Sequence, residues 1–270
     1  MPVAHDSADL LDERADGARP AVIFDVDGVL VDSPHERAWQ EALAELMAGP
    51  WRDIAPQTSY TPEHFTSEVY QTRLSGKPRM SGARSVLDYF GVPDLDRRVI
   101  EYAENKQKRI EALIDAGEFV AYADAIRFVT ALKASGVRIA AASSSKNANR
   151  FMKQIHLDDG GLLLDSFEAN VCGRDLKHGK PHPEIFLLAA GDLSVDPANC
   201  IVVEDAAAGI AAARAGGMLG LGIARFNDED LLAAEHADLV VTSLDDVSLP
   251  ALLEGRLERA ATPLGAAAAD

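Results

Sequence analysis

The stretch from Ala21 to Asp32 (AVIFDVDGVLVD) constrains the fold of this chain more than any other. Its apolar residues Ala21–Phe24 are typical of a buried parallel strand, and they run directly into an acidic pair. Because side chains alternate along a strand, we expect Asp25 and Asp27 to project to one side where the strand ends, and Gly28 permits whatever turn follows. Two carboxylates at this spacing repel each other unless a cation lies beside them, so the stretch predicts a divalent-metal site in which one carboxylate is also a nucleophile. The plain alternative is a strand followed by an acidic turn.

The length and composition indicate a globular protein of two domains. The 270 residues suit a catalytic domain with a smaller one, and 47% hydrophobic with 26% charged residues is ordinary for such a protein. No apolar run approaches the length of a membrane span. Residues 1–20 lack an apolar signal core and predict a flexible leader. Residues 254–270 end in an Ala-rich, low-complexity run and predict a C-terminal tail.

The charge and the cysteines exclude several classes of function. A formal net charge of −17 argues against binding to nucleic acid or to an anionic membrane. Residues 34–117 contain 11 basic and 13 acidic residues, so the acidic excess lies elsewhere, either in metal-binding carboxylates or in a solvated surface. Cys172 and Cys200 show no CxxC spacing, which argues against a disulfide framework and against a zinc site. We expect a cytoplasmic monomer without a nucleic-acid or membrane partner.

The hydrophobic pattern divides the chain into a helical insert and an α/β remainder. Helices in the insert are expected over residues 35–47, 63–74, 82–90 and 95–117. After it, strands are expected over residues 137–142, 167–171, 201–203, 219–223 and 239–241, and helices over residues 124–135, 149–155, 184–190 and 206–215. This alternation predicts an α/β fold, a doubly wound parallel sheet built from residues 21–33 and 118–253. A helical cap of residues 34–117 is inserted after the first strand, and ligands should bind beyond the carboxyl ends of the strands.

Three further polar clusters are expected at that edge of the sheet. Ser143 follows a predicted strand and offers hydroxyl and backbone N–H donors to an anion, although a serine there also suits a helix cap. Lys180 precedes Pro181 in a rigid, extended loop and supplies the cation that carboxylates and a phosphate need between them. Glu204 and Asp205 end a strand before a helix, where Asp205 is equally suited to be an N-cap.

The order Asp-x-Asp, Ser, Lys, acidic pair resembles the four motifs of the haloacid dehalogenase (HAD) superfamily, over residues 21–241. The resemblance implies a Rossmann-like HAD core in which Asp25 is the nucleophile that becomes an aspartyl-phosphate and Asp27 is the general acid and base. It implies that Lys180 ties Asp25 to the phosphate. The residues that it implies for binding of the phosphoryl oxygens are Ser143, Ser144, Ser145, Lys146 and Asn147.

The resemblance also implies a Mg²⁺ cofactor. Its ligands would be Asp25, the carbonyl of Asp27 and Asp205, with Glu204 near or in the coordination shell, and phosphate and water would take the remaining positions.

The helical insert resembles the cap of the β-phosphoglucomutase-like branch of this superfamily. His35-x-Arg37-Ala38-Trp39 is similar to its hinge segment, and Gly76-Lys77-Pro78-Arg79 resembles the loop whose arginine grips the distal phosphate of the substrate. Lys106 falls where that branch has another lysine, although the helix around it has a generally charged face. The resemblance therefore implies substrate binding by His35, Arg79 and Lys106.

Two positions depart from the family pattern. The segment Tyr122-Ala123-Asp124-Ala125 lacks the Pro-Gly pair that is common there, which weakens inferences about the stiffness of this hinge. Ser144 replaces an alanine that often follows the motif serine, which leaves the chemistry intact.

The implied function is Mg²⁺-dependent interconversion of β-glucose 1-phosphate and glucose 6-phosphate through a bisphosphate, with a small phosphorylated sugar as substrate. The nearest alternative is a phosphatase for a small sugar or polyol phosphate. A dehalogenase is disfavoured because Asp27 is present. A phosphonate hydrolase would need a Schiff-base lysine, and neither Lys77 nor Lys106 has a supporting motif. A regulatory phosphoacceptor module would have no reason to carry a helical cap.

Overall fold

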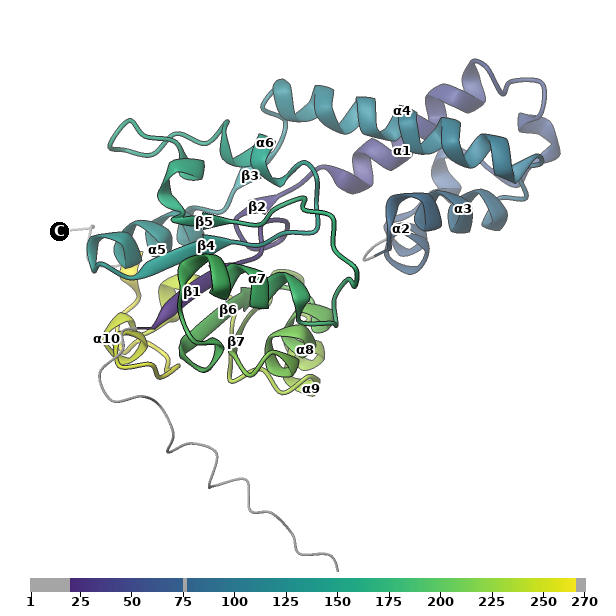
Figure 1. Ribbon diagram of the computed structural model, residues 1–270. Coiled ribbons are helices and arrows are strands. Elements are labelled where there is room, and N and C mark those ends of the chain that lie inside the picture. Colours follow the sequence, from purple (N-terminus) through teal and green to yellow (C-terminus); the bar gives the residue numbers. More distant parts are fainter. Residues whose placement is uncertain (1–19, 75–76, 266–270) are drawn as a thin grey trace, which may run out of the picture. The chain divides into compact units, whose positions relative to one another are not determined.

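The computed structural model of the chain describes residues 20–74 and 77–265 (Figure 1). The predicted leader, apart from Pro20, and the last five residues of the predicted tail lie outside these residues, as do Ser75 and Gly76. The described chain separates into two compact units. We call residues 33–119 the cap unit, and the segments before and after them the core unit.

The secondary structure alternates in the core unit and is helical in the cap unit. The strands are β1 (Ala21–Phe24), β2 (Val31–Asp32), β3 (Val120–Ala121), β4 (Arg138–Ala141), β5 (Ala169–Asn170), β6 (Cys200–Glu204), β7 (Leu219–Ile223) and β8 (Leu239–Val241). The α-helices are α1 (His35–Ala48), α2 (Ser67–Arg73), α3 (Arg79–Tyr89), α4 (Leu95–Asp115), α5 (Ala123–Ala134), α6 (Ala148–Met152), α7 (Glu184–Leu193), α8 (Ala207–Ala215), α9 (Glu229–Ala234) and α10 (Leu249–Leu253). The 3₁₀ helices are Ala55–Gln57, Pro62–His64, Leu163–Ser166, Pro197–Asn199 and Leu244–Asp246.

The core unit is built on a six-stranded parallel sheet of order β5-β4-β1-β6-β7-β8. Strand β1 lies in the middle, and its Ile23 stands opposite Ala140 of β4 and Val202 of β6. All four residues of β1 are fully buried, which explains why the strand is apolar on both faces instead of alternating. The predicted α/β fold with a parallel sheet is confirmed.

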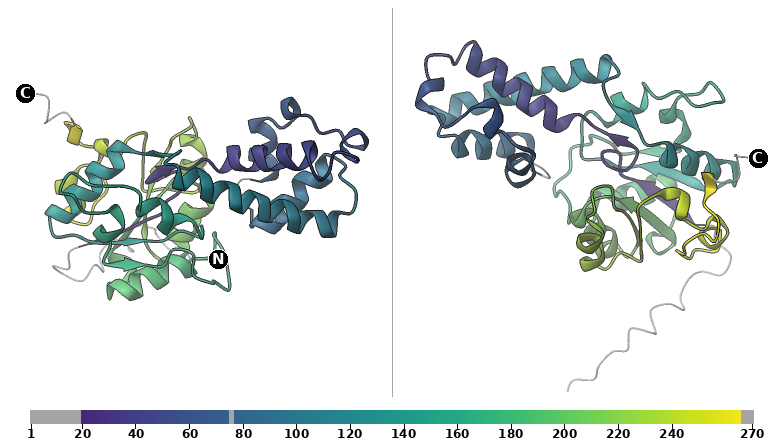
Figure 2. Two further views of the ribbon diagram at one scale, coloured as in Figure 1. Left: turned by 90° about the horizontal axis from the view of Figure 1, so that it is seen from above. Right: turned by 180° about the vertical axis from the view of Figure 1, so that it is seen from behind.

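Helices cover both faces of this sheet (Figures 1 and 2). On one face, Ile23 and Val202 pack in one cluster with side chains of α7 and α8, among them Phe186. On the other face, Phe128 of α5 meets Phe24 edge to face, with ring centroids 6.1 Å apart. The sheet is therefore doubly wound, as the strand and helix alternation predicts.

A short antiparallel ribbon of the core unit pairs the segment that leads to the cap unit with the segment that follows it. Val31 of β2 pairs with Ala121 of β3, and Asp32 pairs with Val120. The chain leaves the core unit after Asp32 and returns to it at Val120. The sequence did not predict this ribbon, because two-residue strands are too short to show an apolar period.

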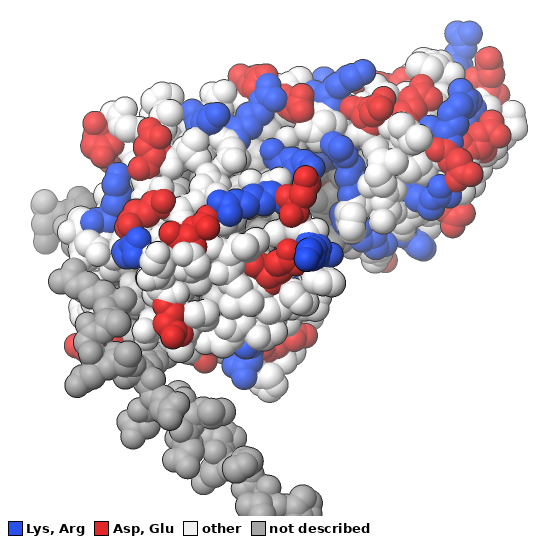
Figure 3. All heavy atoms as spheres, in the orientation of Figure 1, with Lys and Arg blue, Asp and Glu red and all other residues white. Residues whose placement is uncertain are grey.

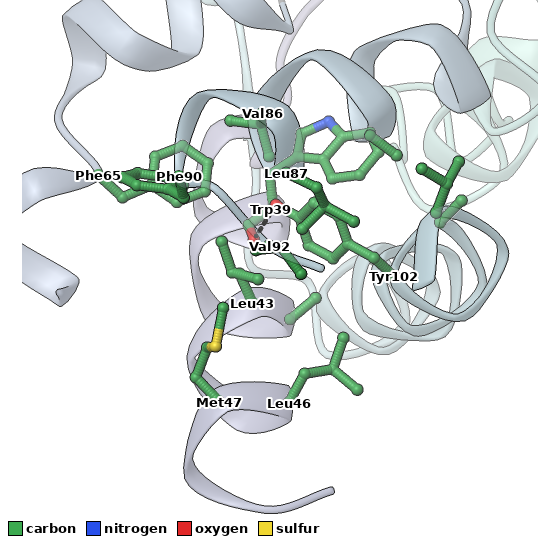
Figure 4. Close-up of a cluster of buried hydrophobic side chains, with 14 of the residues drawn as sticks. Trp39, Leu43, Leu46, Met47, Phe65, Val86, Leu87, Phe90, Val92 and Tyr102 are labelled. Carbon is green, nitrogen blue, oxygen red and sulfur yellow. Dashed lines mark hydrogen bonds between the residues drawn. The ribbon is translucent and has the colours of Figure 1, made fainter. Parts of the chain in front are cut away.

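The cap unit has an apolar centre of its own, formed by α1, α3 and α4 (Figure 4). Trp39 and Tyr102 meet edge to face at 4.9 Å between ring centroids, and the buried Tyr102 hydroxyl donates to the Trp39 carbonyl. The helix predicted over residues 63–74 is wrong in its first turn. Thr66 caps α2 by accepting from the Val69 amide, so the helix begins at Ser67 and residues 62–64 form a separate 3₁₀ turn.

The residues that follow α10 form hydrogen bonds with earlier residues of the core unit. The Ala260 amide donates to the Asp246 carbonyl at 2.7 Å, and the Ser248 amide donates to the Glu258 carbonyl at 2.9 Å. Arg259 also reaches the Val240 carbonyl at 2.7 Å. The first residues of the predicted tail are thus hydrogen-bonded to the core.

The structure bears on three further expectations, which concern the cysteines, a membrane span and the surface charge. Cys172 and Cys200 are buried and unpaired with each other. Over the described ranges, no helix has both the length and the apolar character of a membrane span. Acidic and basic side chains are interspersed on the face drawn in Figure 3, without a broad basic patch.

Candidate active site

The candidate site begins where β1 ends. The Asp25 amide donates to the Val203 carbonyl of β6 at 3.0 Å, which holds Asp25 in line with the sheet, and its side chain is almost fully buried. The following turn is tight, because the Gly28 amide donates to the Val31 carbonyl at 2.8 Å and the Leu30 amide to the Val26 carbonyl at 2.9 Å. Asp27 lies within this turn, so its backbone position is fixed by hydrogen bonds on both sides.

Lys180 joins two of the predicted carboxylates. Its Nζ donates to Asp25 Oδ1 at 2.7 Å and also to the Glu204 carboxylate. The ammonium lies 5.0 Å from the centroid of the Phe186 ring, over its face. The side chains of Lys180, Asp25 and Glu204 are 15%, 9% and 1% exposed, so this charge cluster is shielded from water.

Burial and mutual repulsion perturb the acids of the cluster. Burial, together with the charges of Glu204 and Asp27, raises the pKa of Asp25 to about 7 against the opposing effect of Lys180. Burial also raises the pKa of Asp205 well above its ordinary value, together with the charges of Glu204 and Asp25. For Lys180, burial works to lower the pKa, but the two neighbouring carboxylates raise it above its ordinary value. The buried negative charge therefore exceeds what one ammonium balances.

Two glycines make room for the acidic pair that follows β6. A β-carbon on Gly28 would lie 1.9 Å from Asp205 Oδ2, so the Asp205 carboxylate lies against the main chain directly after Asp27. A β-carbon on Gly209 would lie 2.0 Å from the Glu204 carboxyl carbon, so the first turn of α8 covers Glu204. Gly28 has a second reason to be glycine, because its φ of +81° lies in the left-handed region.

The donor set fits a hard divalent cation. Among the residues that the structure describes, no three His, Cys, Asp or Glu side chains are grouped as ligands of one ion. The set that we expect has the side chains of Asp25 and Asp205 and the main-chain carbonyl of Asp27 as ligands, with Glu204 near or in the coordination shell. Oxygen donors and uncompensated negative charge are what Mg²⁺ requires.

Glu204 is placed differently from the other acids. One of its oxygens accepts from Lys180, and Oε2 accepts from the Ala206 amide at 3.3 Å. These contacts favour a role for Glu204 in holding the ammonium of Lys180 over a role as a metal ligand.

The predicted phosphate-binding segment follows β4. The Ser143 side chain is 2% exposed, and its Oγ accepts from the Ser145 amide at 3.1 Å, while Ser145 Oγ accepts from the Asn147 amide at 3.2 Å. Asn147 is buried and Ser144 is exposed. Lys146 is exposed, and its Nζ pairs with Asp175 at 3.2 Å.

The structure brings the predicted cap residues together around the middle of α4. Lys106 Nζ lies 2.9 Å from His35 Nδ1 and 5.2 Å from the centroid of the Trp39 ring. Lys106 is only 5% exposed, so it lies on the buried side of a helix whose sequence has a generally charged face. Arg79, the first residue of α3, donates to Gln107 Oε1 at 2.6 Å and is exposed.

The sequence did not single out two residues that touch this site. Gly209 had a signal, since a glycine inside an alanine-rich helix costs stability and so points to close packing. Arg225, which donates to the carbonyls of Gly28 and Val29, had none, because a lone arginine in a loop is usually solvated.

Comparisons with known proteins agree with this geometry. The family model of haloacid dehalogenase-like hydrolases matches residues 20–217. A β-phosphoglucomutase from Bacillus subtilis (strain 168) is 32% identical over 240 residues, which cover 87% of this chain and 94% of that protein. A fructose-1-phosphate phosphatase from Escherichia coli (strain K12) is 30% identical over 200 residues, covering 73% of this chain and 92% of that protein.

A solved structure is also similar over most of the chain. It is an archaeal β-phosphoglucomutase from Pyrococcus sp. strain ST 04, with a TM-score of 0.68 and 30% identity, covering 87% of this chain and 97% of that one. The matched sheet, the motif residues at its edge and the relatives agree on one class of chemistry. The chain belongs to the haloacid dehalogenase-like hydrolase family, and it is an enzyme of the phosphotransferase and phosphatase type.

Proposed function

We propose that this enzyme is a Mg²⁺-dependent β-phosphoglucomutase, which interconverts β-glucose 1-phosphate and glucose 6-phosphate through an aspartyl-phosphate on Asp25. The observation that carries the proposal is the buried contact of Lys180 with Asp25 and Glu204. A carboxylate held by a fixed ammonium inside a water-poor site is suited to attack phosphorus, because the cation offsets the repulsion between the two anions.

Each of these side chains has a separate role in the proposed reaction. The Asp25 carboxylate forms a bond to phosphorus as the bond from phosphorus to the sugar oxygen breaks, and Asp27 gives that oxygen a proton. In the return step, Asp27 takes the proton from the other sugar hydroxyl, which attacks the phosphoryl group and frees Asp25. The Ser143 hydroxyl and the backbone amides after it would hold the phosphoryl oxygens, together with the side chains of Ser144, Ser145 and Asn147. Lys146 would join them on leaving its partner Asp175.

Mg²⁺ would be held by Asp25, Asp205 and the main-chain carbonyl of Asp27. Members of the family generally use this ion. When bound, it supplies positive charge that offsets the carboxylates and the transferring phosphoryl group. Glu204 would act on Lys180, as its contacts favour.

The cap unit would bind the sugar and the second phosphate of the bisphosphate. Arg79 is the proposed phosphate ligand, because a guanidinium offers paired donors to a phosphate. His35 and the buried Lys106 form a partly buried pair that would contact the substrate. The choice of mutase is supported by the Bacillus subtilis relative, which is similar over 87% of this chain.

A phosphatase for a small sugar phosphate is the second candidate. It would use the same core residues with water in place of the second sugar hydroxyl. The Escherichia coli fructose-1-phosphate phosphatase supports it at 30% identity, and so does a phosphorylated carbohydrates phosphatase from Thermotoga maritima at 29%.

One assay separates the two candidates. The enzyme is given β-glucose 1-phosphate with a trace of glucose 1,6-bisphosphate and Mg²⁺, and glucose 6-phosphate and free phosphate are followed together. A mutase forms glucose 6-phosphate in large excess over phosphate. If phosphate dominates, the mutase is excluded, and a panel that includes fructose 1-phosphate identifies the substrate. The expected monomeric state and cytoplasmic location remain predictions, the first of which light scattering can test.

A further inference from the structure

Arg225 makes several directed contacts inside the core unit, although it has no part in the proposed chemistry. It follows β7, and its side chain is 9% exposed. Nε donates to the Gly28 carbonyl at 3.3 Å and Nη2 to the Val29 carbonyl at 3.1 Å. Nη1 donates to Asp124 Oδ2 at 2.9 Å, and the guanidinium carbon lies 3.8 Å from the centroid of the Tyr122 ring.

The carboxylate that anchors Arg225 is itself fixed. Asp124 Oδ2 also accepts from the Leu244 amide at 2.8 Å and from Ser243 Oγ at 3.3 Å. Burial works to raise the pKa of Asp124, but the hydrogen bonds from Arg225 and Leu244 hold it below its ordinary value, so the pair is charged near neutral pH. Arg225 is thus held at one end and directed at the Asp27 turn at the other.

The partners of Arg225 lie on both crossings between the units. Gly28 and Val29 come just before β2, where the chain leaves the core unit. Tyr122 and Asp124 come just after β3, where it returns. This second segment is the one that lacks the Pro-Gly pair, and here an ion pair and a cation–π contact fix it instead.

We propose that Arg225 is a positioning residue for phosphoryl transfer: it fixes the turn that carries Asp27 and ties that turn to the returning segment at Tyr122 and Asp124. The inference rests on the proposed role of Asp27 as general acid and base. A guanidinium can reach two carbonyls, a carboxylate and a ring face together because its donors form a planar fork, whereas an ammonium cannot. A small displacement of Asp27 would slow any step that needs its proton.

The first test needs no substrate. Amide hydrogen exchange is compared in wild type, Arg225→Met and Arg127→Met. Arg127 is the control, because it bridges α5 to the Leu244–Asp246 turn through Asp245. Among the hydrogen bonds of the described residues, it has none to the turn that carries Asp27. We expect exchange at the Gly28 and Leu30 amides to rise by about tenfold or more in Arg225→Met only. Unchanged exchange in a folded Arg225→Met protein would overturn the proposal. If Arg225→Met does not fold, Arg225→Lys is used in its place, because lysine keeps a positive charge for Asp124 but lacks the planar set of donors of arginine.

The second test asks whether the proton of Asp27 is affected. Phosphorylation of Asp25 is followed in single turnovers from glucose 1,6-bisphosphate, whose sugar oxygen needs a proton to leave, and from acetyl phosphate, whose acetate does not. In Arg225→Met we expect the first rate to fall by about tenfold to a hundredfold and the second to stay within about threefold of wild type. Arg127→Met should change neither rate.

The outcomes separate this inference from the proposed function. Equal losses with both phosphoryl donors would indicate general damage and overturn the positioning role. Wild-type protein that is phosphorylated by neither donor would overturn the proposed function, and with it the catalytic part of the inference.

Discussion

Asp205 occupies the space that a side chain on Gly28 would need, with its Oδ2 1.9 Å from where that β-carbon would be. The two residues are 177 positions apart, and each follows a neighbouring strand of the sheet, β1 or β6. The turn that follows the proposed nucleophile, Asp25, therefore packs directly against the proposed metal ligand, Asp205. This contact leads to the first prediction.

Gly28→Ala should abolish turnover, whereas Gly217→Ala should not. Both glycines have positive φ, so the backbone strain alone should cost about 1–2 kcal/mol of stability in either variant. Only the Gly28 variant displaces the Asp205 carboxylate, since nothing lies within 4 Å of a β-carbon on Gly217. Mg²⁺ binding by calorimetry should weaken by about tenfold or more in Gly28→Ala alone. Equal activity of the two variants would contradict the proposed site.

Asp25→Asn should lose turnover by several orders of magnitude and keep the fold, because the amide has the size and the hydrogen-bonding oxygen of the acid but cannot form the aspartyl-phosphate. Thermal unfolding and steady-state turnover check this. Asp96→Asn is the control, as that side chain is 94% exposed and pairs only with Arg84 among the described residues. Turnover of Asp25→Asn within tenfold of wild type would remove Asp25 as the nucleophile.

Asp205→Ala and Lys180→Ala should fail for different reasons. The first removes a proposed metal ligand, so Mg²⁺ affinity should fall and excess Mg²⁺ should restore part of the rate. The second removes a buried cation from among carboxylates, so Mg²⁺ affinity should not fall, and added Mg²⁺ should not restore the rate. Mg²⁺ titrations of activity and of binding decide the matter. The same metal dependence in both variants would refute these separate roles.

Arg79→Ala should lower mutase turnover by about a hundredfold, the loss expected when a paired, charge-assisted contact to the second phosphate is removed. Acetyl phosphate has no second phosphate, so its hydrolysis should change little. Arg84→Ala is the matched control, because it lies on the same helix and pairs with exposed Asp96. If Arg79→Ala and Arg84→Ala have the same mutase turnover, Arg79 does not bind the second phosphate.

Asp124→Asn should destabilise the core unit by about 1–3 kcal/mol near neutral pH, because Arg225 loses its buried charged partner. Hydrogen bonds from Arg225 and Leu244 outweigh burial and lower the pKa of Asp124 below its ordinary value of 3.8. The stabilisation is therefore complete above that value and is lost as the pH falls through the lower native pKa. Urea unfolding should show a difference from wild type that is constant above about pH 5 and shrinks in stronger acid. A difference that grows in acid would show that the ionised carboxylate does not stabilise the fold.

The sequence alone determined the local structure and the order of the motifs. The apolar run into Asp25, the glycine after Asp27 and the helical insert are set by periodicity and turn chemistry within a few residues. The parallel sheet follows from the alternation of strands and helices, because parallel neighbours need a crossover between them.

The tertiary structure decided which of these residues meet. The contact of Lys180 with Asp25 spans 155 positions, and that of Arg225 with Gly28 spans 197. Lys106 is buried and lies against His35, although Lys108 and Arg109 give this part of α4 a charged character. The contacts of Lys180 and Arg225 depend on strand order, which places β1 between β4 and β6 and so brings loops distant in the sequence to one edge of the sheet. A local pattern cannot encode that order, since it records only which way each side chain faces within its own element.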